Sequence, residues 1–203
     1  MTLEWIVERG LVKKALAGDR DAAERLVVAH YPGVIRFLLH LTGHINEAEE
    51  LAQETFLKAW SKLGSFEGRS SLRTWLHSIA YREFASRRRL PSHTELDEDT
   101  HDERQNFLAP LVDAIAIENA IAALPDQLRI TFIVCHVEKM SAKEAAQVLS
   151  VPIGTVLSRL HTARERLRRH LVMNDIVTAV PATEPNQNEF EGPQKHEMSQ
   201  AVL

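Results

Sequence analysis

Apolar residues recur at helical spacing in two blocks of this 203-residue chain, and an acidic stretch without such spacing separates the blocks. In residues 47–63 the recurring positions are three and four residues apart. They are Ala48, Leu51, Ala52, Thr55, Phe56 and Ala59. Such spacing lines one face of a helix. Eight glycines and little alternation of β-branched residues leave few candidates for strands. We therefore expect an all-α fold.

The blocks predict two small helical domains, at residues 1–90 and 113–171. The length is ample for two domains of this size. Residues 91–112 contain two prolines and a cluster of acids, so we expect an acidic flexible linker there. Residues 172–203 are polar and proline-containing, and we expect a disordered tail.

Helix boundaries can be placed in both blocks. Asp19 is a suitable cap for a helix that runs to about His30, and residues 31–33 (Tyr-Pro-Gly) predict an interruption. A further apolar stretch, 34–41, then follows. Residues 128–137 are apolar nearly all round, which predicts a buried central helix for the second domain.

The net charge of −4 conceals an uneven distribution. Residues 1–90 hold 14 Lys and Arg against 11 Asp and Glu, and residues 114–171 hold 8 against 5. Residues 91–113 hold 1 against 7. Because the local field decides where a polyanion binds, both basic blocks remain candidates for DNA contact. One cysteine, no apolar run of membrane length and no signal-peptide pattern predict a cytoplasmic protein without membrane insertion.

The second block carries a helix-turn-helix pattern at residues 142–161. Ser141 and Glu144 form a capping-box pair ahead of a short helix, and Pro152 suits the first turn of the next one. That second helix has an apolar stripe for docking and a polar stripe that could enter the major groove. The polar stripe contains Thr155, Ser158, Arg159 and Thr162. The alternative is that its arginines only form a solvated basic helix end.

A basic and aromatic helix is predicted at residues 72–89. Cations that attract phosphates, beside flat rings that stack on bases, are what single-stranded DNA requires. Trp75 lies on the apolar stripe of this helix, however, which strongly favours a place in the hydrophobic core over contact with DNA. The run Arg87, Arg88 and Arg89 could equally be a solvated helix end.

Residues 47–60 (EAEELAQETFLKAW) closely resemble the core-binding segment of the extracytoplasmic-function (ECF) subfamily of sigma-70 family sigma factors. Residues 65–76 (SFEGRSSLRTWL) are similar to the loop and helix that follow in that family. Leu124 and Pro125, with residues 154–168 (GTVLSRLHTARERLR), resemble its second domain. The resemblance covers about residues 8–171.

The resemblance implies a dissociable subunit of bacterial RNA polymerase that recognises promoters. Contact with the clamp helices of the β′ subunit would come from Glu50, Gln53, Glu54, Leu57 and Lys58. The −10 element would be recognised and melted by Phe66, Arg69, Ser70, Arg73, His77, Tyr81, Arg82 and Arg88. The second domain would sit on the β flap and read the −35 element through Thr155, Ser158, Arg159, Thr162 and Arg166. An anti-sigma factor is the further partner implied.

Three positions depart from the family pattern. Leu157 stands where a basic residue is frequent, Thr162 where Arg is frequent, and Ser150 where Gly often ends the first helix of the motif. The first two changes weaken the expected phosphate contact. Two rival interpretations stay open: a helix-turn-helix regulator that acts without polymerase, and a helical adaptor that contacts only proteins.

No motif anchors an enzymatic interpretation, so we expect no catalytic residue, cofactor or metal. His40 and His44 have the helical spacing of metal ligands but lack a third ligand nearby. Cys135 lies in the most apolar predicted helix and is expected to be an inert buried thiol.

Overall fold

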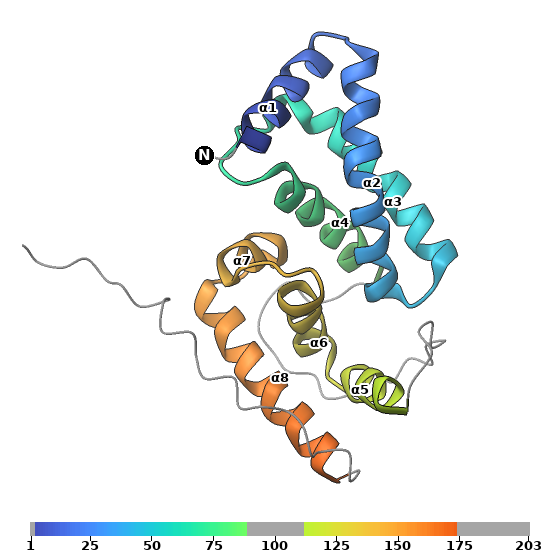
Figure 1. The fold of residues 1–203 in the computed structure, drawn as a ribbon, viewed down its shortest axis with the longest axis vertical. Helices are drawn as coiled ribbons and strands as arrows, with labels where there is room; N and C mark the ends of the chain where they lie inside the picture. The colour runs from blue at the N-terminus through green and yellow to red at the C-terminus, as the bar shows by residue number, and fades with distance from the viewer. Residues whose placement is uncertain (1–2, 89–111, 174–203) are drawn as a thin grey trace, which may run out of the picture.

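The computed structural model describes residues 3–88 and 112–173, and all regular structure in these ranges is helical (Figure 1). The all-α prediction is confirmed. The N-terminal unit occupies the upper part of Figure 1 and the C-terminal unit the lower part. The elements of the N-terminal unit are α1 (Leu3–Leu16), α2 (Arg20–Thr42), α3 (Ile45–Lys62), the short 3₁₀ turn η1 (Leu63–Ser65) and α4 (Leu72–Arg88).

Helix α2 corrects one boundary prediction, because it runs without interruption through Pro32. Asp19 caps it as expected, accepting a hydrogen bond from the amide of Ala22 at 3.1 Å. Gly43, in the left-handed conformation at φ 74°, ends it. A proline inside a helix removes one hydrogen bond and crowds the preceding turn. Here the exposed ring faces solvent, while Phe37 and Leu38 just beyond it are completely buried, and this packing maintains the helix.

The predicted apolar face of α3 is confirmed as core. Ala48, Leu51, Ala52 and Thr55 are completely buried between α2 and α4. The hydroxyl of Thr55 donates to the carbonyl of Leu51 at 2.7 Å, so this buried polar group is satisfied inside its own helix.

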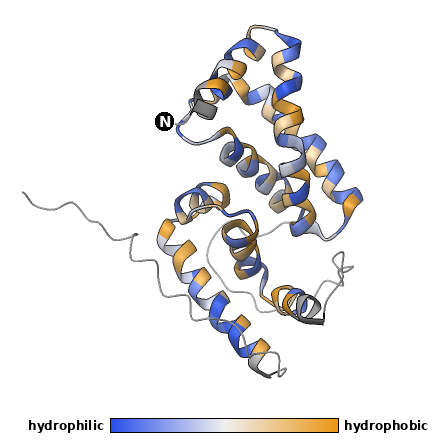
Figure 2. Cartoon of the chain, viewed as in Figure 1, coloured by the Kyte–Doolittle hydropathy of each residue, from blue (hydrophilic) through white to orange (hydrophobic). Residues whose placement is uncertain are grey.

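The C-terminal unit consists of α5 (Val112–Ala122), α6 (Asp126–Phe132), the π-helical turn η2 (Ile133–Val137), α7 (Ala142–Leu149) and α8 (Ile153–Met173). The single helix expected over 128–137 is therefore only partly correct. Its second half widens into a π turn, in which the amide of Glu138 donates to the carbonyl of Ile133 at 2.9 Å. In Figure 2 most helices carry both hydropathic colours, and α8 is strongly hydrophilic along its lower half.

The capping box of α7 is confirmed. Ser141 Oγ accepts from the amide of Glu144 at 3.3 Å, and Glu144 Oε2 accepts from the amide of Ser141 at 3.0 Å. Ser150 ends α7 with φ 56°, in the left-handed region that glycine adopts without strain. The turn of the motif therefore keeps its usual geometry without the expected glycine.

The two units share a core. One continuous cluster of buried apolar side chains includes Phe84 of α4 together with Met140 and Val148 of the C-terminal unit. Helix α4 packs against α7 at the junction (Figure 1). A smaller cluster of Leu124, Leu128 and Ala163 joins α6 to α8. The predicted linker up to residue 111, and the predicted tail from residue 174, lie outside the described residues.

Membrane-span and metal-site patterns can be judged only for the described ranges. Within residues 3–88 and 112–173, no helix combines the length and hydropathy needed to cross a bilayer. In the same ranges no three His, Cys, Asp or Glu side chains gather as metal ligands would.

Candidate nucleic-acid and protein interfaces

One side of α3 presents the five residues predicted to dock on polymerase. Leu57, in the second half of α3, is 73% exposed. Three of the others form ion pairs with residues of α4. Arg87 donates to Glu50 at 3.0 Å and to Glu54 at 2.9 Å, while Lys58 pairs with Glu83. Gln53 is exposed.

Trp60 extends this surface, and sequence reasoning did not select it. It lies one turn beyond Leu57 and is 49% exposed. Trp60 also lines an apolar pocket between α2, α3 and the start of α4, together with Val27, Phe56 and Trp75. Large aromatic and aliphatic side chains left in water are typical of protein-binding surfaces.

Three of the residues predicted to bind the −10 element form a stripe along α4 that faces the C-terminal unit. Arg73, His77 and Tyr81 are spaced by four residues. His77 is only 1% exposed. Burial raises the pKa of Tyr81, with Arg159 and Asp126 of the C-terminal unit close enough to influence it electrostatically. The stripe is thus partly covered in this conformation, since the Arg73 side chain is still 41% exposed and Tyr81 is half-buried.

The other predicted −10 residues lie on the loop before α4 or elsewhere along that helix. Arg69 is 82% exposed at its side chain and pairs with Glu67 at 2.7 Å. Phe66 packs on Trp75 with ring centroids 5.3 Å apart. Other contacts include Ser70 with the Ser71 carbonyl at 3.3 Å, Arg82 with Ser78 at 3.2 Å, and Arg88 with Glu47 at 3.6 Å.

On α8, the apolar stripe docks as expected, with Val156, Leu160 and Ala163 buried. The free side of the helix carries Ser158, which was predicted, and His161, which was not. The remaining predicted positions are half-buried: Thr155, Arg159, Thr162 and Arg166.

Arg159 lies on the flank of α8 that faces α6. Its guanidinium donates to the side-chain oxygen of Gln127 at 2.5 Å, and burial lowers its pKa. Helical spacing located the stripe that docks on α7, but it did not reveal that α6 packs beside α8 as well. The structure therefore does not bring Arg159 to the same exposed surface as Ser158.

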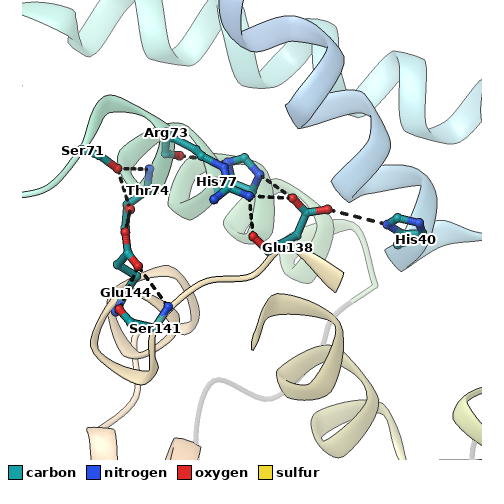
Figure 3. Close-up of polar contacts among 8 residues, drawn as sticks. All are labelled: His40, Ser71, Arg73, Thr74, His77, Glu138, Ser141 and Glu144. Atoms are coloured by element: carbon teal, nitrogen blue, oxygen red, sulfur yellow. Dashed lines mark hydrogen bonds and ion pairs between the residues drawn. The ribbon is translucent and has the colours of Figure 1, made fainter. Parts of the chain in front are cut away.

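The junction between the units contains a polar cluster centred on Glu138, which directly follows η2 (Figure 3). The Glu138 side chain is 2% exposed. Arg73 Nη2 donates to Glu138 Oε2 at 2.9 Å and to the Glu138 carbonyl at 2.7 Å. His77 Nε2 lies 3.5 Å from Oε2, and His40 Nδ1 lies 3.7 Å from Oε1. The two histidines are at charge-contact distances, longer than good hydrogen bonds.

Glu138 is ionised in this environment. Burial by itself would raise the pKa of its carboxyl group, but His40, His77 and Arg73 outweigh burial and hold the pKa well below its usual range. Neither Glu138 nor the roles of the two histidines was found from the sequence, because the groups come from three distant segments. The four-residue spacing of Arg73 and His77 was the only available signal.

A second polar contact crosses the same junction. Thr74 Oγ1 donates to Glu144 Oε1 at 3.2 Å, and Ser71 lies beside it with its hydroxyl 2.8 Å from that of Thr74. Glu144 also completes the capping box, so the start of α7 is tied to the first turn of α4 (Figure 3).

Cys135 is half-buried in η2 rather than fully enclosed. Burial raises the pKa of its thiol, although Arg164 acts in the opposite direction. A raised pKa keeps the thiol protonated and weakly nucleophilic. This supports the expectation of an inert cysteine.

Family models identify both units. The sigma-70 region 2 model matches residues 26–90, and the sigma-70 region 4 model matches residues 114–167. The chain is 30% identical over 161 residues to the RNA polymerase sigma factor YlaC of Bacillus subtilis, covering 75% of this chain and 93% of that protein. It is 32% identical over 169 residues to the ECF RNA polymerase sigma factor SigC of Mycobacterium tuberculosis, covering 77% and 87%.

Solved structures show the same architecture. The sigma factor RpoE of Bartonella quintana, solved in complex with the anti-sigma factor NepR, aligns with a TM-score of 0.57 at 28% identity, covering 74% of this chain and 97% of that one. CnrH, solved with the cytosolic domain of CnrY, aligns with a TM-score of 0.62 at 22% identity and shows the shared fold.

The fold and these surfaces define a two-unit helical transcription factor with a helix-turn-helix in its second unit. The chain belongs to the ECF subfamily of sigma-70 family RNA polymerase sigma factors. It is an alternative sigma factor, which binds RNA polymerase and promoter DNA and directs transcription initiation. Members of this family are initiation factors and not enzymes. The N-terminal unit is hereafter called region 2, and the C-terminal unit region 4.

Proposed function

We propose that region 2, residues 1–90, docks on core RNA polymerase and opens the −10 element, while region 4, residues 113–171, reads the −35 element. Residues 91–112 would connect them. The observation that carries this division of labour is the exposed side of α3. Leu57 and Trp60 are presented to solvent there, although neither contributes to the core of region 2.

Docking would use the α3 side against the clamp helices of the β′ subunit. Leu57→Asp should abolish co-purification with core polymerase, because it places a charge where an apolar contact is required. Val28→Asp is the matched control, since Val28 is 66% exposed on α2, outside this surface. Equal recovery of polymerase by the Leu57→Asp variant and the unsubstituted protein would contradict the docking assignment.

Recognition of the −10 element would begin with groups that are already accessible. Arg69 and Arg82 are exposed and can meet phosphates, and the loop before α4 could hold a flipped base. Arg73, His77 and Tyr81 would join after region 4 moves away from α4. Unstacking a base costs a few kcal/mol, which stacking partners offset.

Reading of the −35 element would use α8 in the major groove, with region 4 on the β flap. Ser158 and His161 are on its free side, and Thr155, Thr162 and Arg166 border it. Arg159 would contribute only after leaving Gln127. Run-off transcription with purified core and a genomic promoter library tests the whole proposal. Absence of any transcript, with no holoenzyme formed, would refute it.

We infer that an anti-sigma protein controls this factor and that it works in the cytoplasm, where RNA polymerase is found. The likeness to RpoE, which was solved with the anti-sigma factor NepR, supports this inference. Affinity purification of the tagged protein from its native host should recover such a partner. Recovery of polymerase alone would argue against a stable one.

A further inference from the structure

We propose that the free protein is held closed by Glu138, whose carboxylate occupies an anion site on region 2 and thereby masks the −10-binding stripe of α4. This inference rests on the proposed role of α4 in strand binding. It adds an intramolecular control that precedes any partner: region 4 itself competes with DNA.

The anion site is built from two helices of region 2. Helix α4 supplies Arg73 and His77, and α2 supplies His40, and all three approach one carboxylate of region 4 (Figure 3). Arg73 also donates a hydrogen bond from the same nitrogen to the backbone carbonyl of Glu138. The carboxylate is almost fully removed from water, whereas the Arg73 side chain is 41% exposed, so solvent screens this attraction on the arginine side only.

The hydrogen positions on His77 follow from its neighbours. Its Nδ1 lies 2.9 Å from the Arg73 carbonyl, which can only accept, so Nδ1 carries a hydrogen. In a neutral ring Nε2 would then turn a lone pair toward Glu138. Only the charged ring offers a hydrogen to the carboxylate. Arg73 is therefore the permanent cation that holds Glu138 in place.

Two further contacts cover the same side of α4. Thr74, the residue after Arg73, donates a hydrogen bond from its hydroxyl to Glu144. Two turns further along, Tyr81 is near Arg159 of α8. The shared apolar cluster continues beneath these polar contacts. Region 4 thus approaches the stripe from the predicted phosphate contact to the predicted aromatic platform: it buries His77, partly covers Tyr81 and leaves the Arg73 side chain 41% exposed.

A DNA strand requires the groups that region 4 occupies. Its phosphates need Arg73, and its bases need the face of Tyr81. Glu138 supplies a negative charge where a phosphate would sit, so strand and carboxylate exclude each other. The apparent dissociation constant for DNA is then the intrinsic constant divided by the open fraction, and anything that loosens Glu138 tightens DNA binding.

The test compares the full-length protein with Glu138→Gln and Glu165→Gln. The first change removes the charge at the junction, and the second removes the same charge from an α8 surface pair with Arg168. The probe is a fluorescein-labelled random-sequence single-stranded oligodeoxynucleotide pool, followed by anisotropy. We expect Glu138→Gln to bind at least about tenfold tighter than the unsubstituted protein, and Glu165→Gln to match the unsubstituted protein.

Small-angle scattering on the same samples separates the two proposals. An increased radius of gyration for Glu138→Gln, together with tighter strand binding, supports masking. Equal strand affinity in all three proteins, with no change in the radius of gyration, would leave the α4 assignment standing and overturn masking. An expanded Glu138→Gln protein with no gain in strand binding would overturn both masking and the α4 assignment.

A measurement without substitution covers the case in which Glu138→Gln misfolds, as judged by circular dichroism. Saturating the unsubstituted protein with the oligonucleotide pool should increase its radius of gyration, because the strand can occupy α4 only after region 4 leaves. An unchanged radius of gyration with the strand bound would overturn the proposal.

Discussion

Glu138 illustrates how a single buried charge depends on its neighbours. Its low pKa means that the folded protein binds a proton at this carboxyl less readily than the unfolded chain does. The stabilisation is therefore fully present above the ordinary carboxyl pKa of 4.5 and is lost as the pH falls through the folded-state value. Any protonation of Glu138 favours separation of the two regions.

The lowered pKa of Glu138 leads to a prediction about how the free energy of unfolding depends on pH. Below about pH 5, the difference in free energy of unfolding between the unsubstituted protein and Glu138→Gln should shrink by at most about 1.4 kcal/mol per pH unit as the pH falls. Urea titrations of both proteins across this range measure it. A difference that grows as the pH falls below about 5 would contradict an ionised, attractively held carboxylate.

Ser150 offers a second prediction at a single residue. Its φ of 56° is costly for a residue with a side chain and unstrained for glycine. Ser150→Gly should therefore raise the free energy of unfolding by about 0.5–1 kcal/mol. Chemical denaturation measures this. Ser158→Gly, inside α8, is the control and should destabilise by about 0.5 kcal/mol, because glycine has a lower helix propensity than serine. Loss of stability in both variants would refute the strain argument.

Among the elements, α8 has an apolar stripe that the sequence predicted and a side facing α6 that the sequence did not predict. Its buried positions follow from helical spacing, but the placement of Arg159 depends on α6. Leu157 is 50% exposed on the free side, where a cation would meet a phosphate. The exposure of Leu157 is consistent with the weak phosphate contact expected from the sequence, and that contact stays a prediction.

Leu157→Arg should restore that contact. We expect tighter binding to −35 duplex DNA and a salt dependence steeper by about 0.9 in the log–log slope, the value for one additional neutralised phosphate. Ile117→Arg is the matched control, since Ile117 is 46% exposed on α5 of the same region. Fluorescence anisotropy of holoenzyme or free protein on duplex DNA at several salt concentrations measures both. Identical slopes for the two variants would place Leu157 away from DNA.

At the scale of the whole molecule, the shared core joins regions that the sequence presents as separate. Continuous apolar packing and the Glu138 cluster should make the two regions unfold together. We expect one calorimetric transition for the unsubstituted protein and two, or one clearly broadened transition, for Glu138→Gln. Glu165→Gln should retain a single transition. Two well-separated transitions in the unsubstituted protein would contradict coupling between the regions.

The sequence alone determined the helical class, the buried face of α3, the capping box of α7 and the family, because these depend on spacing and on motifs within one segment. It could not determine the continuity of α2 through Pro32, the π turn before Glu138 or the meeting of His40, Arg73, His77 and Glu138. These features depend on which distant surfaces pack together, and local propensities cannot express the free energy of such packing. Only the tertiary structure therefore revealed that region 4 packs on the predicted DNA-binding stripe of α4 and buries His77.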